Sequence, residues 1–139
     1  MKIVRTTAQE MGEMYGTLFV QCFGEWIDHH VPDFILLSVT DSGDDIMGFL
    51  SCFQSKQHEV YVMWGGFRPE YRGIGVRGKL KQARDYLHER YKSVITTVEN
   101  SNVPMLKLYL SLGYLIYGIK TSSDNHTYLE LIHLKEGEE

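Results

Sequence analysis

The sequence predicts an α/β domain built on a mixed sheet. Some short segments alternate apolar and polar residues, as strands do, and others repeat apolar residues at helical spacing. Along the chain these segments follow the order β, α, loop or α, β, β, β, α, β, α, β, β. The 139 residues are 43% hydrophobic, which is enough for one core, so we expect a single domain over residues 1–139.

In the first half of the chain, residues 1–7 alternate as a short strand does, and Thr6 or Thr7 can cap a helix that runs to residue 24. The expected buried stripe of that helix is Met11, Met14, Tyr15, Phe19 and Cys22. Residues 25–34 contain Pro32 and predict a loop or a short helix. Residues 34–39 and 46–54 flank a turn-rich segment and predict an antiparallel hairpin, and residues 58–68 continue the sheet.

In the second half, residues 78–92 carry Leu80, Ala83, Leu87 and Tyr91 at helical spacing. Residues 93–98 are β-branched and predict a buried strand. Residues 102–113 predict a helix, because proline stands near the start of the segment and glycine at its end. Residues 114–120 and 126–134 predict two further strands.

Composition excludes several classes of protein. The net charge of -4 gives no global basic surface, so we expect no nucleic-acid partner. Cys22 and Cys52 lie far apart without a CxxC motif, and the adjacent His29 and His30 cannot easily share one helical face, so we expect reduced thiols and no metal. The sequence has neither an apolar signal segment nor an apolar run of membrane-spanning length, and we expect a cytoplasmic protein without membrane contact.

The segment EYRGIGVRGKL, residues 70–80, places glycines beside arginines where a helix begins. The first backbone N–H groups of a helix have no partner within it and form an anion site. Gly73 and Gly75 let a bulky anion approach the backbone, and Arg72 and Arg77 can add charge-assisted hydrogen bonds. The segment lacks the hydroxyl residue of a P-loop, and its GxGxxG pattern follows an antiparallel meander, so a nucleotide-binding α/β protein is a weaker alternative.

Residues 72–77, RGIGVR, resemble the acyl-CoA signature [Q/R]xxGx[G/A] of the GNAT superfamily of N-acetyltransferases. Thirty residues further on, NVPMLKLYLSLGY is similar to a second family pattern, in which Asn102, Tyr109, Gly113 and Tyr114 take the matching places. Arg77 and Met105 depart from the small residues of the family. The resemblance implies the GNAT fold, a mixed and mostly antiparallel sheet of about six to seven strands, with two splayed parallel strands in its middle and about four helices around it.

The resemblance further implies acetyl-CoA as cofactor and direct attack of a primary amine on its thioester. Gly65 and Gly66 would form a bulge that starts the splay. Tyr109 would be the general acid, and Glu59 is the candidate base, with His58 and Glu99 behind it. The residues expected to bind the cofactor are Phe67, Arg68, Arg72, Gly73, Ile74, Gly75, Val76, Arg77, Gly78, Asn102 and Tyr109.

The expected acceptor residues are Trp26, His30, Tyr61 and Trp64, and His29 and Tyr117 are further candidates. The acceptor itself stays open among a polyamine, an antibiotic, an amino acid, a peptide N-terminus, lysine and a tRNA-linked amine. A homodimer is possible. Lys79, Lys81 and Arg84 would form a solvated helix face, from which one side chain can reach the 3′-phosphate. The alternative, from another functional class, is a non-catalytic module that binds acyl-CoA. Arg77 in the signature and the lack of an obvious base favour this alternative.

Overall fold

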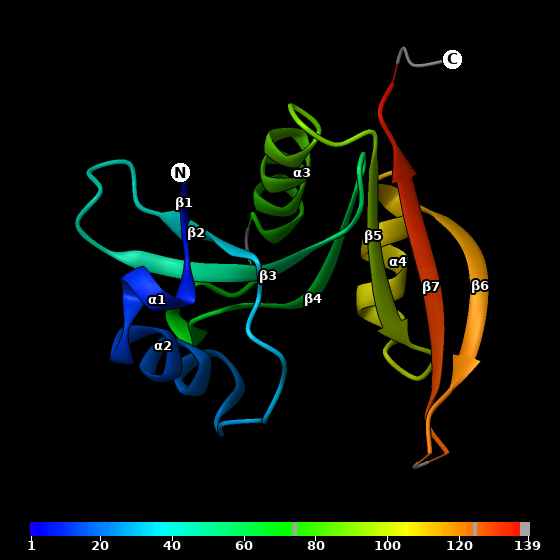
Figure 1. Cartoon of the computed structure of the whole chain (residues 1–139), viewed down its shortest axis with the longest axis horizontal. Helices are drawn as coiled ribbons and strands as arrows, with labels where there is room; N and C mark the ends of the chain where they lie inside the picture. Colours follow the sequence, from blue (N-terminus) through cyan, green and yellow to red (C-terminus); the bar gives the residue numbers. More distant parts are fainter. Residues whose placement is uncertain (74, 124, 137–139) are drawn as a thin grey trace. The chain divides into compact units, whose positions relative to one another are not determined.

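The computed structural model describes residues 1–73, 75–123 and 125–136 (Figure 1). Its one sheet has seven strands in the order β1-β2-β3-β4-β5-β7-β6. The β4 and β5 strands are parallel, and the pairs β1-β2, β2-β3, β5-β7 and β6-β7 are antiparallel. The predicted fold class, a mixed and mostly antiparallel sheet with four flanking helices, is confirmed.

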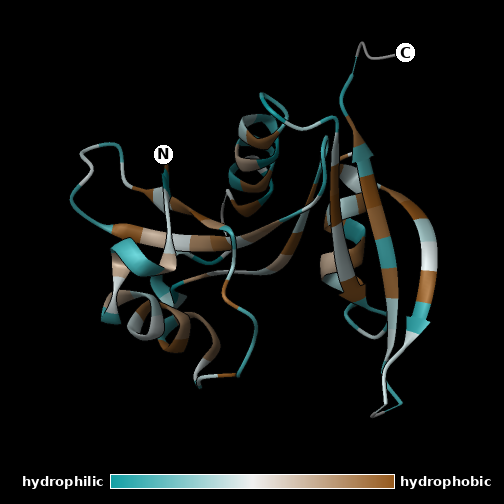
Figure 2. Cartoon of the chain, in the orientation of Figure 1, coloured by the Kyte–Doolittle hydropathy of each residue, from teal (hydrophilic) through white to brown (hydrophobic). Residues whose placement is uncertain are grey.

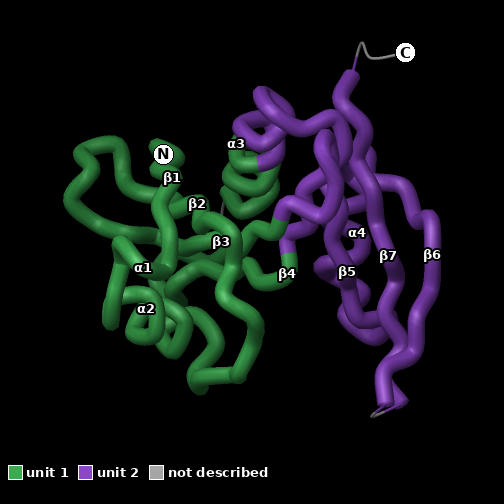
Figure 3. The backbone as a smooth tube through the Cα atoms, in the orientation of Figure 1, with its two compact units in different colours: residues 1–53, 63–83 green, residues 54–62, 84–139 purple. Residues whose placement is uncertain are grey.

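The elements in chain order are β1 (Lys2–Thr6), α1 (Ala8–Met11), α2 (Glu13–Phe23), β2 (Phe34–Val39), β3 (Ile46–Lys56), β4 (Glu59–Phe67), a 3₁₀ turn (Pro69–Tyr71), α3 (Val76–Leu87), β5 (Ser93–Glu99), α4 (Val103–Ser111), β6 (Leu115–Thr121) and β7 (Thr127–Leu134). The chain forms two compact units, each described below by itself (Figure 3). Unit 1 contains residues 1–53 and 63–83, and unit 2 contains residues 54–62 and 84–139.

The core of unit 1 lies between α2 and the strands β2 and β3. Tyr15, Leu18, Phe19 and Cys22 line the inner face of α2 and pack on Ile35, Leu37, Val39 and Phe49. Every residue of β2 is buried, and its Ile35, Leu37 and Val39 pack in the core with α2.

In unit 2 the sheet has two distinct faces. Thr96 and His133 lie on one face. Thr96 is hydrogen-bonded to Tyr109 of α4, and the His133 ring contacts the ring of Tyr114, which follows α4. The register of β5 and β7 pairs Thr97 with Glu130, so these two side chains lie on the opposite face. The β7 strand is mostly hydrophobic in Figure 2, and Glu130 and His133 interrupt it on opposite faces.

Some sequence expectations were wrong in detail. The helix predicted to run to residue 24 is broken at Gly12, whose φ of 58° ends α1 and starts α2 afresh. Met14 was expected in the buried stripe but is 58% exposed, whereas Met11, Tyr15, Phe19 and Cys22 are buried as expected. The α3 helix begins at Val76, two residues before the expected start. Residues 25–33 form a loop, the first of the two predicted alternatives.

Candidate functional site

The loop between β4 and α3 in unit 1 has the conformation that its glycines permit. Gly73 has a φ of 94° and Gly75 a φ of 84°, both in the region that side-chain-bearing residues rarely adopt. A Cβ added at Gly73 would meet nothing within 4 Å, and at Gly75 only the Lys79 Cε at 3.9 Å. These two glycines are therefore required by backbone conformation and leave open space beside the start of α3. Ile74 lies outside the described residues.

Arg72 holds the loop in place. Its Nε donates to the carbonyl oxygen of Phe67 at 3.0 Å, and a terminal nitrogen donates to the carbonyl of Cys22. Cys22 is in the last turn of α2, where carbonyl groups lack helical partners and a cation is favourable. The guanidinium therefore ties the end of β4 to the end of α2.

Arg68 and Tyr71 anchor the same loop to β3. Arg68 Nη1 donates to Asp45 Oδ1 at 2.7 Å and to the carbonyl of Ile46 at 3.0 Å, and the Tyr71 hydroxyl donates to the other Asp45 oxygen. The Tyr71 hydrogen bond, followed by Arg68, lowers the pKa of Asp45. An ionised Asp45 thus fixes both ends of the turn between β4 and the glycines.

The remaining signature residues lie in the first turn of α3. Val76 is half-buried, and Arg77 and Gly78 are exposed. Lys79 Nζ donates to the carbonyl of Tyr71 at 3.1 Å and lies 5.2 Å from the centre of the Phe67 ring. Positive charge from Arg77 and Lys79 therefore accompanies the helix N-terminus, as an anion site requires.

The end of β4 passes very close to its neighbours. A Cβ on Gly48 would lie 2.3 Å from the Gly66 carbonyl oxygen, and one on Gly65 would lie 2.5 Å from Leu50 Cδ2. Side chains at these positions would force the strands apart, so glycine is needed for packing. The parallel pairing of β4 with β5 joins Glu59–Val62 to Ser93–Thr96. The bulge at Gly65 and Gly66 and the splay of the two strands stay predictions.

An aromatic cluster surrounds Phe19 in unit 1. The rings of Trp26, His29 and Trp64 lie 5.1, 4.9 and 5.5 Å from its centre. His29 Nδ1 lies 2.7 Å from the carbonyl of Ile27, which fixes the proton on Nδ1 and leaves Nε2 to accept from the Tyr15 hydroxyl at 2.6 Å.

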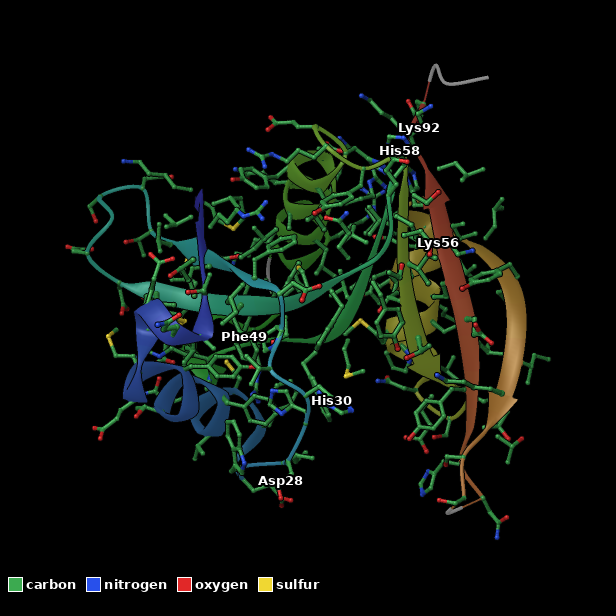
Figure 4. The ribbon with its side chains drawn as sticks, in the orientation of Figure 1. Asp28, His30, Phe49, Lys56, His58 and Lys92 are labelled. Carbon is green, nitrogen blue, oxygen red and sulfur yellow. The ribbon has the colours of Figure 1, made fainter. Side chains whose placement is uncertain are left out.

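Two of the three acceptor candidates in this unit belong to that cluster. Trp26 is 47% exposed and donates to Asp28 at 2.8 Å. Trp64 Nε1 is buried and has no hydrogen-bond partner among the described residues. His30 is exposed and lies on the same loop as Asp28 (Figure 4).

In unit 2, Tyr109 is held by β5. The Thr96 hydroxyl donates to the carbonyl of Val62 at 3.0 Å and is hydrogen-bonded to Tyr109, so it accepts the phenolic proton. Burial raises the pKa of Tyr109, which therefore keeps its proton near neutral pH. The Tyr114 ring, 4.9 Å away at 75°, packs edge-on against it. The phenol is thus a fixed and protonated donor.

The other candidates of unit 2 have identifiable partners. Asn102 caps α4, since its Oδ1 accepts from Met105 N at 3.4 Å. Glu59 accepts from Ser55 at 2.6 Å, and the Tyr61 hydroxyl lies 3.1 Å from Thr97 Oγ1. Glu99 is paired with His126 Nδ1 at 2.5 Å. His58 is exposed, near Lys92 in Figure 4, and its carbonyl accepts from the Lys92 amide at 2.8 Å.

No local pattern in the sequence indicates the buried histidine pair on the helix side of unit 2. His88 Nδ1 lies 2.9 Å from the carbonyl of Tyr91, and His88 Nε2 lies 2.8 Å from His133 Nδ1. Burial and the nearby Arg84 lower the pKa of His133 to about 4, so the pair is neutral at pH 7. Arg84 was expected on a solvated face, which is wrong: it is buried and donates to the carbonyl of Leu112.

Among the described residues, no group of three His, Cys, Asp or Glu side chains could hold a metal ion. Cys22 and Cys52 are both buried free thiols, and burial raises the pKa of Cys22 to about 11. No helix among the described residues is long and apolar enough to cross a membrane.

Residues 2–114 match the Acetyltransferase (GNAT) family, and the matched region includes the glycine loop, Asn102 and Tyr109. The chain therefore belongs to the GNAT family of acetyltransferases. No curated protein matches its sequence.

Solved structures of acetyltransferases share the fold. Nourseothricin acetyltransferase is 25% identical with a TM-score of 0.59, over 73% of this chain and 64% of that one, so the chain spans less than two thirds of that protein. A chimera of spermidine N-acetyltransferase SpeG from Vibrio cholerae and hSSAT has a TM-score of 0.76 at 13% identity, over 96% of both chains. The NatC complex bound to Gag peptide and CoA has a TM-score of 0.66 at 14% identity, over 97% of this chain and 99% of that one.

Proposed function

We propose that the protein, as one domain over residues 1–139, transfers an acetyl group from acetyl-CoA to a primary amine by direct attack of the amine on the thioester. The observation that carries the proposal is the loop after β4, whose two left-handed glycines precede the N-terminus of α3 within the region matched by the family. The nourseothricin, spermidine and CoA-bound NatC structures support the choice of acetyl-CoA and of an amine acceptor.

In this proposal the cofactor's diphosphate binds the backbone N–H groups at the start of α3, together with Arg77. Arg68 and Arg72 act on the loop and not on the phosphates, because their guanidinium groups are engaged by Asp45 and by two carbonyls. The amide near Phe67 polarises the thioester carbonyl, and Asn102 both caps α4 and flanks the cofactor.

Two proton transfers complete the reaction. The neutral amine nitrogen forms a bond to the acetyl carbon and releases a proton to solvent, the carbon–sulfur bond breaks, and Tyr109 gives its proton to the departing thiolate and is reprotonated from solvent. An alkylamine of pKa near 10.4 must first lose a proton, which costs roughly 4.6 kcal/mol at pH 7, whereas an α-amine of pKa near 7.7 costs about 1. Glu59 is the proposed base for the first kind of acceptor.

Release of free thiol from acetyl-CoA in the presence of a panel of amines tests the proposal. Tyr109→Phe should lower kcat by about 10²-fold or more while the CoA dissociation constant stays within about twofold, since only the proton donor is lost. CoA binding without thiol release from any amine would instead support a non-catalytic acyl-CoA-binding module. Competition of ATP with CoA would favour a nucleotide-binding protein.

A further inference from the structure

The face of unit 2 opposite α4 contains a hollow of about 370 Å³ lined by Thr97, Lys120, Ser122 and Tyr128. This volume falls in the range of about 300–1,000 Å³ that is usual for small-molecule sites. Thr97 faces the hollow from β5, one residue after Thr96, which holds Tyr109 on the other side of the strand. The hollow therefore begins one residue from the partner of the proposed general acid.

Lys120 supplies the charge of this hollow. It lies opposite Tyr128 in the pairing of β6 with β7, and among the described residues it forms no ion pair and no hydrogen bond through its ammonium group. The other three lining residues, Thr97, Ser122 and Tyr128, carry hydroxyl groups, which are polar and neutral. An ammonium with three free donors favours a ligand that brings a negative charge.

Neighbouring carboxylates do not neutralise Lys120. Glu99 is paired with His126 at 2.5 Å. Glu130 lies across Gly118, where an added Cβ would be 3.1 Å from Glu130 Oε1, and its carboxylate is hydrogen-bonded to Tyr117. A register shift between Ile116 and Gly118 brings Tyr117 to this carboxylate. Glu99 lies opposite Tyr128 and Glu130 lies opposite Thr97 in the pairing of β5 with β7, so both acids flank the hollow, but each is engaged by its own partner and not by Lys120.

The hydroxyl groups of the hollow can add donors of their own. The Tyr61 hydroxyl lies 3.1 Å from Thr97 Oγ1, and when Tyr61 donates, the Thr97 proton is free to point into the hollow. Lys120 and Thr97 lie on strands separated by β7, and each offers a donor to a ligand in the hollow. A carboxylate, with two oxygens and about four lone-pair sites, fits this set.

We infer that the hollow binds the carboxylate of the acceptor, so that the acceptor is a primary amine that carries a carboxylate, of the amino-acid class. This inference rests on the proposed acetyl transfer, because only that reaction makes the bound amine an acceptor. The binding of a carboxylate in the hollow does not depend on it. A purely cationic polyamine is the competing occupant, and it would bring a like charge beside Lys120. Lys120 is the residue that distinguishes the two classes.

Pairs of compounds that differ only in the carboxylate give the test: L-lysine with cadaverine, L-arginine with agmatine, and L-phenylalanine with phenethylamine. Calorimetric titration of each compound into the full chain, with and without saturating CoA, measures binding independently of turnover. The amino acid should bind at least about tenfold more tightly than its decarboxylated partner in one pair or more, as a charge-assisted hydrogen bond predicts. Lys120→Met should reduce that preference to about twofold or less, and Lys120→Arg should retain it.

Lys56→Met is the matched control, because Lys56 is an exposed lysine at the end of β3 in the same unit. This variant should prefer each amino acid over its decarboxylated partner by the same factor as the parent. Three results would each overturn the inference. The decarboxylated amines could all bind as tightly as the amino acids or more tightly, Lys120→Met could keep the parent's preference for the amino acid, or none of the six compounds could give heat. Failure of the proposed function looks different: no binding of CoA and no thiol release, whatever the hollow binds.

Discussion

Replacing Gly75 by alanine tests whether the loop before α3 needs its left-handed backbone. Gly75 has a φ of 84°, and an added methyl group meets only the flexible Lys79 side chain at 3.9 Å. The cost is therefore conformational and not steric. Holding an L-residue in this region costs about 1–2 kcal/mol.

This cost divides between folding and binding. If the loop of Gly75→Ala keeps its shape without ligand, the free energy of unfolding falls by about 1–2 kcal/mol. If the loop relaxes without ligand, the free energy of CoA binding is reduced by the same amount, and the CoA dissociation constant rises roughly 5- to 30-fold. Urea unfolding and calorimetric CoA titration of parent and Gly75→Ala measure the two losses, whose sum should reach about 1–2 kcal/mol.

Gly78→Ala is the control, since it adds the same methyl group three residues further on, where the backbone is helical. Gly78 lies inside α3, and nothing stands within 4 Å of the added atom. Alanine is the better helix former, so the free energy of unfolding should stay the same or rise by up to about 1 kcal/mol. A combined loss below about 0.5 kcal/mol in Gly75→Ala, or equal destabilisation by Gly78→Ala, would refute the conformational requirement.

Three further predictions concern stability and catalysis. Because the folded pKa of His133, about 4, lies below its unfolded value near 6.5, the stability that the neutral pair with His88 provides is complete above pH 6.5. About 3 kcal/mol should be lost as the pH falls to 4, and urea midpoints of His133→Gln should vary less over this range. Arg72→Met should cost about 1 kcal/mol in urea unfolding, because it removes the bond to Cys22. In Tyr109→Phe, loss of thiol release without loss of CoA affinity should separate chemistry from binding.

The sequence predicted the parts of the fold that depend on local pattern. The hairpin of β2 and β3, the parallel strand β5 and the helix capped by Asn102 all follow from alternation, β-branching and capping. The break at Gly12 escaped prediction, because the residues on both sides continue the helical spacing and only the backbone angle of 58° separates them.

Contacts between distant residues could not be predicted in the same way. His88 and His133 are 45 positions apart, and only the folded sheet brings them together. Arg72 was expected to face the phosphates, but its carbonyl partners at Phe67 and Cys22 come from the ends of β4 and α2, whose proximity no local pattern encodes. The pairing of Glu130 with Tyr117 depends on a shift of register that a single sequence does not reveal.

The most direct measurement compares CoA with pantetheine, which lacks the diphosphate and the 3′-phosphoadenosine attached to it, in calorimetric titrations of the parent chain. If the amides after Gly75 grip the diphosphate, CoA should bind at least about 100-fold more tightly than pantetheine, as two charge-assisted hydrogen bonds predict. Equal affinities, or no heat from CoA at all, would contradict the assignment of this loop as the cofactor site.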